Sequence, residues 1–360
     1  MSNARADVGE STLLDVVRKR IRRDGPMPVD AYMQICQTDP QHGYWQRAGS
    51  IGAGGDFITA PEISQACGEL IGLWCAVVWQ GMGRPAPLRL IELGPGRGTL
   101  MRDALRAART VPGFLDATTV DLIEASRPLQ ELQHQALASC VPIAWHDTVN
   151  EVPDGPAIVI ANEFLDALPI RQLVFRDGVW RERVVEVDSH GALRFAAGPE
   201  ADCEGEGPAA PGAILELRAA EDELFAQLEK RQGPLAALFI DYGPTEPAYG
   251  DTLQAVRRHA YVDPLGAPGS ADLTAHVQFA RLACKARAAG LTAAGPITQT
   301  EFLGALGIAE RAARLMAANP TQAGSIEAGV QRLISPTGMG ELFKVMAVRS
   351  RTLPPLPPFV

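Results

Sequence analysis

A glycine-rich turn is the first feature of this sequence that could do chemistry. The run Glu92-Leu93-Gly94-Pro95-Gly96-Arg97-Gly98-Thr99 continues an apolar, strand-like segment that begins at 88, and it leads directly into a helical pattern. Glycines let the backbone come close to a ligand, and the first turn of a helix offers N–H groups that lack partners within the helix. We therefore expect Gly94, Gly96 and Gly98 to hold a small ligand.

The pattern of this turn separates two classes of ligand. The sixth position of a dinucleotide fingerprint is Gly or Ala, whereas this sequence has Thr99 there. The turn instead fits the E/D-x-G-x-G-x-G signature of methyltransferases that use S-adenosylmethionine, in which Glu92 would orient the ammonium group of the donor. NAD is the rival ligand, although Pro95 and the lack of a Tyr-x-x-x-Lys arrangement or a catalytic histidine count against it.

Two further acids follow the next two apolar runs. Glu124 ends the run at 120–124, where its carboxylate could accept hydrogen bonds from both hydroxyls of a ribose. Asp147 comes just after the run at 143–145 and is placed to meet the adenine amino group. Each acid alone could be a helix cap or a surface charge. Three acids at successive strand ends, however, match the amino-acid, sugar and base parts of S-adenosylmethionine, so Glu92, Glu124 and Asp147 are predicted donor-binding residues.

The elements that must position these residues alternate in type. Short apolar runs are separated by helical patterns such as those at 99–108 and 128–138. This alternation predicts an α/β fold with a mostly parallel sheet that is covered on both faces. The predicted strands are 89–93, 120–124, 143–145, 157–161, 235–240 and 343–348.

Regions with other sequence patterns flank and interrupt this core. Residues 1–85 are predicted as an N-terminal helical region that covers the donor site. A long apolar helix is predicted at 61–79. We expect its surface at 71–79 to be part of the core, and the alternative is a face for a homodimer. Residues 172–233 are predicted as an inserted subdomain, because Asp177-Gly178 and His190-Gly191 are typical of antiparallel hairpins and 197–212 has the composition of a mobile loop. The donor-binding core would then consist of 86–171 and 234–360.

The composition limits the classes of partner. The 360-residue chain has a formal net charge of -9, which argues against a broad nucleic-acid footprint because phosphate binding needs clustered Lys and Arg. The basic cluster at 18–23 is interpreted as a solvated helix face. No segment approaches the ~20 apolar residues of a membrane span, and no secretory signal is evident. Six scattered cysteines without a C-x-x-C pair predict reduced thiols in a cytosolic protein and no metal site.

Four segments together resemble one family, the MidA-like methyltransferases, which includes a mitochondrial protein-arginine methyltransferase that acts in complex I assembly. The segments are Gly55-Asp56-Phe57-Ile58-Thr59-Ala60-Pro61-Glu62-Ile63-Ser64-Gln65, the glycine-rich turn, Ala161-Asn162-Glu163-Phe164-Leu165-Asp166-Ala167-Leu168-Pro169 and Asp272-Leu273-Thr274-Ala275-His276-Val277. The resemblance spans nearly the whole chain. Two residues depart from the family pattern, since Gln278 stands where similar proteins tend to have Asp and Cys67 where an aromatic residue is expected.

This resemblance implies a fold, a donor and a class of substrate. The fold would be a Rossmann-like class I methyltransferase core with an N-terminal helical region and inserted antiparallel hairpins. The donor would be S-adenosylmethionine, and the substrate would be an arginine-bearing protein such as a subunit of a respiratory complex. The N-terminus lacks the Arg-rich, acid-poor composition of an organellar targeting segment. We therefore expect a bacterial, cytoplasmic member without organellar targeting.

The end of the fourth strand is where this class of fold faces the donor methyl group. Asn162, Glu163 and Asp166 lie there. Since paired carboxylates can hold a guanidinium bidentately, Glu163 and Asp166 are predicted to bind the arginine, with Asn162 as a polar positioner. Capping of the following turn is the alternative for these residues.

Two more segments complete the predicted site. Thr59 and Pro61 are predicted to contact the donor, and Asp56 and Glu62 to contact the substrate. A helix cap alone would require neither the aromatic Phe57 nor the whole run around it. A third substrate ligand, Asp272, lies four residues before His276 on one face of a predicted helix start.

His276 is a candidate general base, with a structural histidine as the alternative. Two other functions also stay open: a small-molecule O- or N-methyltransferase, and a non-catalytic assembly factor that binds the donor.

Overall fold

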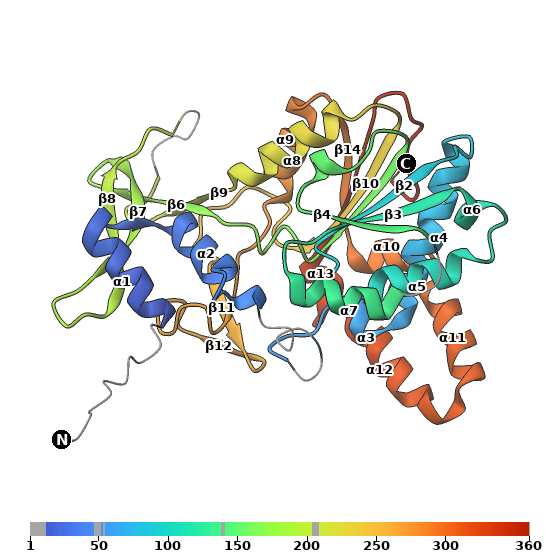
Figure 1. Cartoon of the computed structure of the whole chain (residues 1–360), viewed down its shortest axis with the longest axis horizontal. Coiled ribbons are helices and arrows are strands. Elements are labelled where there is room, and N and C mark those ends of the chain that lie inside the picture. The colour runs from blue at the N-terminus through green and yellow to red at the C-terminus, as the bar shows by residue number, and fades with distance from the viewer. Residues whose placement is uncertain (1–11, 47–51, 53–54, 138–140, 204–208, 360) are drawn as a thin grey trace, which may run out of the picture. The chain divides into compact units, whose positions relative to one another are not determined.

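The computed structural model describes residues 12–46, 52, 55–137, 141–203 and 209–359. The chain divides into two compact units (Figure 1). The smaller unit comprises Met1–Gln46, Pro169–Leu217 and Tyr249–Leu273, and the larger one Arg47–Leu168, Arg218–Ala248 and Thr274–Val360. These limits do not coincide with the predicted domains, since residues 1–46 join the hairpins and the long helix after residue 60 joins the sheet.

The larger unit is built on a seven-stranded sheet within the described residues. Strands β4, β3, β2, β5 and β10 run parallel, and β15 lies antiparallel between β10 and β14. All six predicted strands are present with ends shifted by one or two residues. In sheet order, the strands are β14 (Thr292–Thr298), β15 (Phe343–Arg349), β10 (Leu235–Tyr242), β5 (Ala157–Asn162), β2 (Leu88–Leu93), β3 (Thr118–Ile123) and β4 (Ile143–His146).

The strands bury both of their faces because successive side chains point to opposite sides. Leu88 and Leu90 of β2 belong to one apolar cluster, whereas Ile91 and Leu93 belong to another. The first cluster includes residues of α3 (Ala60–Ile63), α4 (Gln65–Gly81), α5 (Thr99–Ala108), α6 (Phe114–Ala117), α7 (Arg127–Leu137), α10 (Gln299–Ala305), α11 (Ile308–Ala318), α12 (Ala323–Ile334) and α13 (Met339–Leu342). The second includes residues of η2 (Val149–Glu151), α8 (Ala219–Lys230) and α9 (Phe279–Ala288). The predicted two-sided α/β core is thus confirmed.

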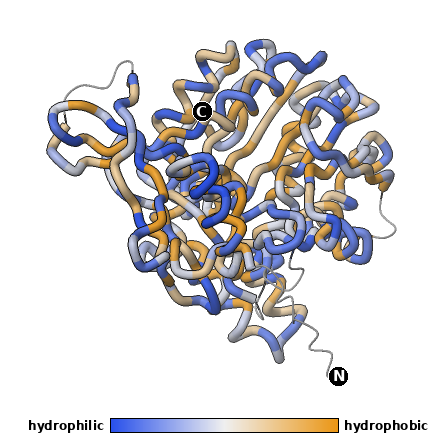
Figure 2. The backbone as a smooth tube through the Cα atoms, turned by 60° about the vertical axis from the view of Figure 1, so that its left-hand side comes forward, coloured by the Kyte–Doolittle hydropathy of each residue, from blue (hydrophilic) through white to orange (hydrophobic). Residues whose placement is uncertain are grey.

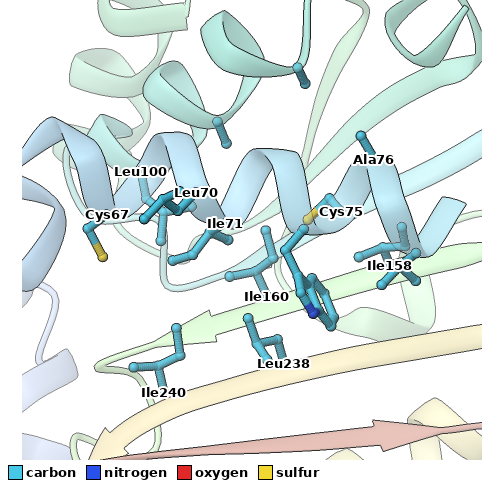
Figure 3. Close-up of a cluster of buried hydrophobic side chains, with 14 of the residues drawn as sticks. Cys67, Leu70, Ile71, Cys75, Ala76, Leu100, Ile158, Ile160, Leu238 and Ile240 are labelled. Atoms are coloured by element: carbon cyan, nitrogen blue, oxygen red, sulfur yellow. The ribbon is translucent and has the colours of Figure 1, made fainter. Parts of the chain in front are cut away.

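Helix α4 belongs to the core of the larger unit. Figure 3 shows it lying along strands whose side chains Ile158, Ile160 and Leu238 face it. A Cβ at Gly72 would lie 2.3 Å from the carbonyl oxygen of Ala104, so this glycine allows α5 to pack directly against α4. The surface at 71–79 is therefore core rather than a dimer face, although Val77 is exposed.

The smaller unit is organised around antiparallel strands. β1 (Met27–Pro28), β7 (Val179–Val187), β6 (Arg171–Arg176) and β9 (Ile214–Leu217) follow one another in the sheet, and β8 (Leu193–Glu200) also pairs with β7. Hairpin turns occur at both predicted positions, but β8 extends into the segment predicted as a loop. The unit also holds α1 (Leu13–Asp24), α2 (Val29–Thr38), η1 (Tyr44–Gln46) and a small sheet of β12 (Ala260–Val262), β11 (Gln254–Arg257) and β13 (Asp272–Thr274).

Hydrophobic and hydrophilic residues are interleaved along the backbone (Figure 2). No helix in the described part of the chain is both long enough and apolar enough to span a membrane. Among those same residues, the searched groups of His, Cys, Asp and Glu contain none that could hold a metal ion.

Candidate active site

The order of the strands defines a crevice at one edge of the central sheet. The chain runs from β2 outward through β3 and β4 and then returns to β5 on the other side of β2. Ligands of open α/β sheets bind at such a switch point, beyond the carboxyl ends of the strands. A pocket that is open to solvent lies there, lined by Phe57, Thr59, Pro61, Glu62, Glu92, Gly94, Pro95, Gly96, Arg97, Thr99, Leu100, Asn162 and Glu163.

The glycine-rich turn forms one wall of this pocket. Gly94, Gly96 and Gly98 all have positive φ, and Gly98 immediately precedes α5. A Cβ at Gly94 would lie 2.8 Å from Cδ2 of Phe164, so a larger residue would collide with the turn after β5. The predicted strand, turn and helix are all present, and the backbone is exposed to the pocket where a side chain could not fit.

Glu92 is buried at the end of β2 and lines the pocket. Burial raises the pKa of Glu92 to about 8, and the nearby carboxylate of Glu124 adds to the rise. Its Oε2 atom has no hydrogen-bond partner among the described residues. A buried carboxylate oxygen left without a partner is costly, so this group is suited to a cationic ligand.

Glu124 follows β3 and is buried beside the glycine-rich turn. Its Oε1 accepts from the backbone N–H of Ser126 at 2.8 Å, and its Oε2 accepts from Nε2 of Gln133 at 3.1 Å. The same Gln133 nitrogen donates to the carbonyl oxygen of Gly96 at 2.7 Å, which ties the acid to the turn. Burial raises the pKa of Glu124 to about 7, and these two hydrogen bonds oppose the rise.

Asp147 is less closely connected to the pocket. It is exposed after β4, and its backbone N–H donates to Oε2 of Glu151 at 3.0 Å. Neither Asp147 nor Glu124 lines the pocket, although Glu124 interacts with the lining residue Glu92. The structure thus brings Glu92 and Glu124 together and leaves Asp147 at the periphery.

The turn after β5 forms the opposite wall. Glu163 adopts a φ of 51°, which is uncommon for a residue with a side chain. Its Oε1 accepts from the backbone N–H of Ala60 at 2.7 Å and from Nδ2 of Asn162 at 3.1 Å. Burial raises the pKa of Glu163 to about 8, with the neighbouring Asp166 and Glu62 adding to the rise. The carboxyl groups of Glu163 and Glu62 therefore influence each other within one pocket.

Asp166 lies behind this turn rather than in the pocket. It is buried, it interacts with the Tyr242 side chain, and its backbone N–H donates to Oδ2 of Asp241 at 3.1 Å. Burial raises the pKa of Asp166, and the same cause together with the Asp166 charge raises that of Asp241. Asp166, predicted to bind the guanidinium together with Glu163, therefore does not line the pocket, although its charge reaches Glu163.

The prediction that Asp272 and His276 share a helix face is wrong. Asp272 lies in β13 of the smaller unit, and His276 lies in the loop before α9, which begins at Phe279. The ring of His276 stands edge-on to Tyr242, with 5.5 Å between ring centroids. The short β-strand overrides the helical spacing because tertiary pairing outweighs local pattern.

The segment before α4 contributes the cover of the pocket. Phe57, Thr59, Pro61 and Glu62 line it, whereas Asp56 does not. Oε1 of Glu62 lies 3.5 Å from Nε of Arg97, which joins this segment to the glycine-rich turn. Burial raises the pKa of Glu62, and the guanidinium of Arg97 opposes the rise.

Sequence reasoning assigned no role to several residues of this site, among them Arg97, Leu100, Gln133 and Phe164. Arg97 and Leu100 lie in or just after the glycine-rich turn, and their contact with a ligand pocket carries no separate motif. Gln133 sits in an ordinary helical pattern, so its link between Gly96 and Glu124 appears only once α7 is packed. Phe164 is part of the motif after β5, but its contact with Gly94 depends on the pairing of β2 with β5.

A family model described as S-adenosyl-L-methionine-dependent methyltransferase matches residues 70–297. The chain belongs to this methyltransferase family. Its donor is therefore S-adenosylmethionine, as predicted, and not the rival ligand NAD. The Rossmann-like fold class and the MidA-like resemblance are confirmed by the relatives described next.

Curated relatives of this methyltransferase span most of its length. "Protein arginine methyltransferase NDUFAF7, mitochondrial" of Danio rerio is 35% identical over 375 residues, which cover 94% of this chain and 86% of the relative. The homolog of Drosophila melanogaster is 35% identical over 382 residues, with 96% and 87% covered. The Homo sapiens protein is 34% identical over 369 residues, with 91% and 81% covered.

Two solved structures share the fold of this methyltransferase. A crystal structure from Burkholderia thailandensis, bound to S-adenosyl-homocysteine, has a TM-score of 0.84 at 29% identity and covers 95% of this chain and 92% of that chain. A native crystal structure of the same superfamily and organism has a TM-score of 0.81 at 30% identity, with the same coverage. S-adenosyl-homocysteine is the product left when S-adenosylmethionine loses its methyl group.

One expectation from the sequence needs correction. The curated relatives are named as mitochondrial proteins, so the prediction of a cytoplasmic localisation is contradicted. The prediction used the composition of the first residues and the scattered cysteines, neither of which reports a compartment directly, and residues 1–11 lie outside the described part of the chain.

Proposed function

We propose that this methyltransferase transfers the methyl group of S-adenosylmethionine to an arginine side chain of a protein. The names of its curated relatives state this activity for those proteins. The observation that carries the proposal is the excess of carboxyl groups in the pocket: its described lining residues include three glutamates, Glu62, Glu92 and Glu163, and one basic residue, Arg97. An excess of carboxyl groups favours cations, and both the sulfonium donor and an arginine are cations.

The donor end of the proposed site centres on Glu92. Its Oε2, unpartnered among the described residues, would accept a hydrogen bond from the ammonium group of the donor. Gly94 and Gly96, which line the pocket, would present backbone to the methionine and sugar parts, and Gly98 would shape the turn from its place just before α5. Glu124 would bind the ribose hydroxyls.

The outer parts of the donor fall to the remaining residues. Asp147 stays the proposed contact for adenine, at the rim. Thr59 and Pro61, both lining the pocket, would cover the donor from the segment before α4.

The acceptor end of the proposed site uses Glu163 and Glu62 as the pair that holds the guanidinium. Both line the pocket, and they lie close enough for the charge of one to raise the pKa of the other. Asn162 would position Glu163 through their 3.1 Å hydrogen bond. Asp166 and His276 act from behind the turn in this proposal, and Asp56 and Asp272 stay candidate contacts for the rest of the protein substrate.

The chemistry asks mainly for orientation. A nitrogen lone pair of the arginine attacks the methyl carbon, the carbon–sulfur bond breaks, and its electron pair stays on sulfur. Holding the two reactants in line supplies effective molarities of roughly 10⁵ M or more. The free guanidinium has a pKa above about 12, so its proton leaves as the new bond forms, and in this proposal the ionised carboxylate of Glu163 receives it. The excess proton then passes to solvent.

The natural substrate is proposed to be a subunit of a respiratory complex of the complex I type. This identity rests on the MidA-like resemblance and on the names of the mitochondrial relatives. The composition of the pocket is evidence for a cationic acceptor side chain and for nothing more specific.

The proposal is tested by feeding the purified enzyme labelled donor together with extract from cells that lack it. We expect label in methylarginine after acid hydrolysis of the protein fraction, and a matching loss of one methylated arginine in the deletion cells by mass spectrometry. The variant Glu163→Gln should lose this transfer, whereas Glu341→Gln, an exposed glutamate that does not line the pocket, should keep it. Label confined to metabolites would indicate a small-molecule methyltransferase, and donor binding with no transfer would indicate a non-catalytic assembly factor.

A further inference from the structure

Asp241 is a buried acid that lies directly behind the turn carrying Glu163. It is the penultimate residue of β10, and its neighbour Ile240 pairs with Asn162, the last residue of β5. Parallel strands end on the same side of a sheet, so the end of β10 is a natural support for whatever follows β5.

The Asp241 carboxylate accepts backbone hydrogen bonds from the turn itself. Its Oδ2 accepts from the N–H of Leu165 at 2.9 Å and from that of Asp166 at 3.1 Å. Its Oδ1 accepts from the N–H of Tyr242 at 2.9 Å. Both oxygens are thus occupied by N–H donors, two of which belong to the turn after β5.

The turn needs such support because its first residue is strained. Glu163 has a φ of 51°, a region that residues with a Cβ occupy only when the surroundings hold them there. The N–H of Glu163 donates to the carbonyl oxygen of Ile240 at 2.8 Å. Three N–H groups of the turn, those of Glu163, Leu165 and Asp166, therefore bond to β10.

The conformation held in this way aims the Glu163 side chain. At this φ the carboxyl group reaches the backbone N–H of Ala60 and lines the pocket. Relaxation of the turn to the ordinary negative φ would swing Glu163 away from both.

We propose that Asp241 is a positioning residue that fixes the turn at 163–166 and thereby sets the orientation of the Glu163 carboxylate toward the pocket. The inference rests on the proposed role of Glu163 in methyl transfer. It assigns Asp241 no contact with either substrate.

The test compares Asp241→Ala with Asp121→Ala in the full-length protein. Asp121 is an equally buried acid in β3 of the same sheet, but it bonds to His146 and Arg89 and lies outside the pocket. We expect Asp241→Ala to speed amide exchange in 163–168 about tenfold, measured by mass spectrometry, because the N–H groups of Leu165 and Asp166 lose their common acceptor, Oδ2. Its Kd for S-adenosyl-homocysteine and its KM for protein should stay within about threefold, while kcat falls about tenfold or more.

The control and the conservative variant separate positioning from stability. Asp121→Ala should lower Tm but leave exchange in 163–168 and kcat within about twofold of the wild type. Asp241→Asn keeps one oxygen acceptor, so its exchange and kcat should lie between those of the wild type and Asp241→Ala. It also serves as the test if Asp241→Ala does not fold.

Two results would overturn the inference: exchange in 163–168 that changes no more than in Asp121→Ala, or faster exchange with an unaltered kcat. If the wild-type enzyme transfers no methyl group to any protein, the proposed function fails instead. The positioning role is then decided by exchange and by the φ of Glu163 in a crystal structure of Asp241→Asn.

Discussion

Two turns at neighbouring strand ends face the same pocket, and both place a residue in the left-handed region. After β2 that residue is Gly94, with a φ of 61°, and after β5 it is Glu163, with a φ of 51°. The first turn offers backbone to the pocket, while the second offers a carboxyl group. The same backbone problem is therefore solved by removing a side chain in one place and by supporting one in the other.

The comparison shows why backbone strain is avoided at position 94 and retained at position 163. A Cβ at position 94 would meet Phe164 at 2.8 Å, so glycine is required for packing as well as for φ. At position 163, glycine would relieve about 1–2 kcal/mol of backbone strain but would remove the carboxyl group that reaches Ala60. The strain is thus retained for the side chain.

The largest expected effect concerns the carboxyl group of the second turn. Glu163→Gln should lower kcat by about 10³-fold, because the neutral amide neither offers a negative charge to the guanidinium nor receives its proton. Its Kd for S-adenosyl-homocysteine should change by less than about threefold. Single-turnover transfer of labelled methyl groups and calorimetry measure the two quantities. Full-rate transfer by Glu163→Gln would remove this residue from the mechanism.

The next effect concerns the backbone of the first turn. Gly94→Ala should weaken binding of S-adenosyl-homocysteine about 30-fold, because the added methyl group collides with Phe164 and is strained at positive φ. Gly81→Ala is the matched control, since a Cβ there meets nothing within 4 Å. Calorimetry on both variants checks the difference. Equal affinity in the two variants would show that the turn does not hold the donor.

A smaller effect is the pH dependence of donor-site affinity, which should follow Glu92 beside the first turn rather than the acid of the second turn. Burial raises the pKa of Glu92 to about 8, and only the ionised group can pair with the donor's ammonium. Affinity for S-adenosyl-homocysteine should therefore rise about tenfold or more as the pH increases from about 6.5 to 8.5. Glu92→Gln should flatten most of this slope, with a remainder from Glu124. A slope that survives Glu92→Gln unchanged would assign it to another group.

The same raised pKa has a consequence for the stability of the free protein. The folded chain binds the Glu92 proton more tightly than the unfolded chain, whose ordinary value is 4.5. The contribution of this group to stability is therefore present below that value and is lost as the pH rises through about 8. Thermal unfolding of the wild type and of Glu92→Gln across this range tests the sign.

The smallest effect isolates the strain in the second turn. Glu163→Gly and Glu163→Ala both lose the carboxyl group, but only alanine keeps an unfavourable Cβ at a φ of 51°. We expect the glycine variant to be more stable by about 0.5–1 kcal/mol, after allowance for the greater chain entropy of glycine. Denaturant unfolding of the two variants measures this difference. An alanine variant of equal or higher stability would mean that the turn relaxes when the side chain is lost.

Much of the site could be predicted from the sequence because its signals are local. Gly94, Gly96 and Gly98 reveal a strand–turn–helix through spacing alone, and Glu92 lies at a fixed offset from them. The place of Glu163 at the pocket followed from its position just after β5. Asp166, predicted to bind the guanidinium with Glu163, does not line the pocket, since a separation of three residues does not fix direction in an irregular segment.

What the sequence determined by itself is the class of the molecule: alternating strands and helices, a glycine-rich turn for a nucleoside donor, and acids at strand ends. These follow from short-range periodicity, which the chain carries wherever it folds. The tertiary structure decided which groups meet. Gln133 reaches Gly96 across 37 residues, Asp241 reaches Leu165 across 76, and Ala60 reaches Glu163 across 103. Such contacts arise only when strands pair side by side in an order that no local pattern encodes.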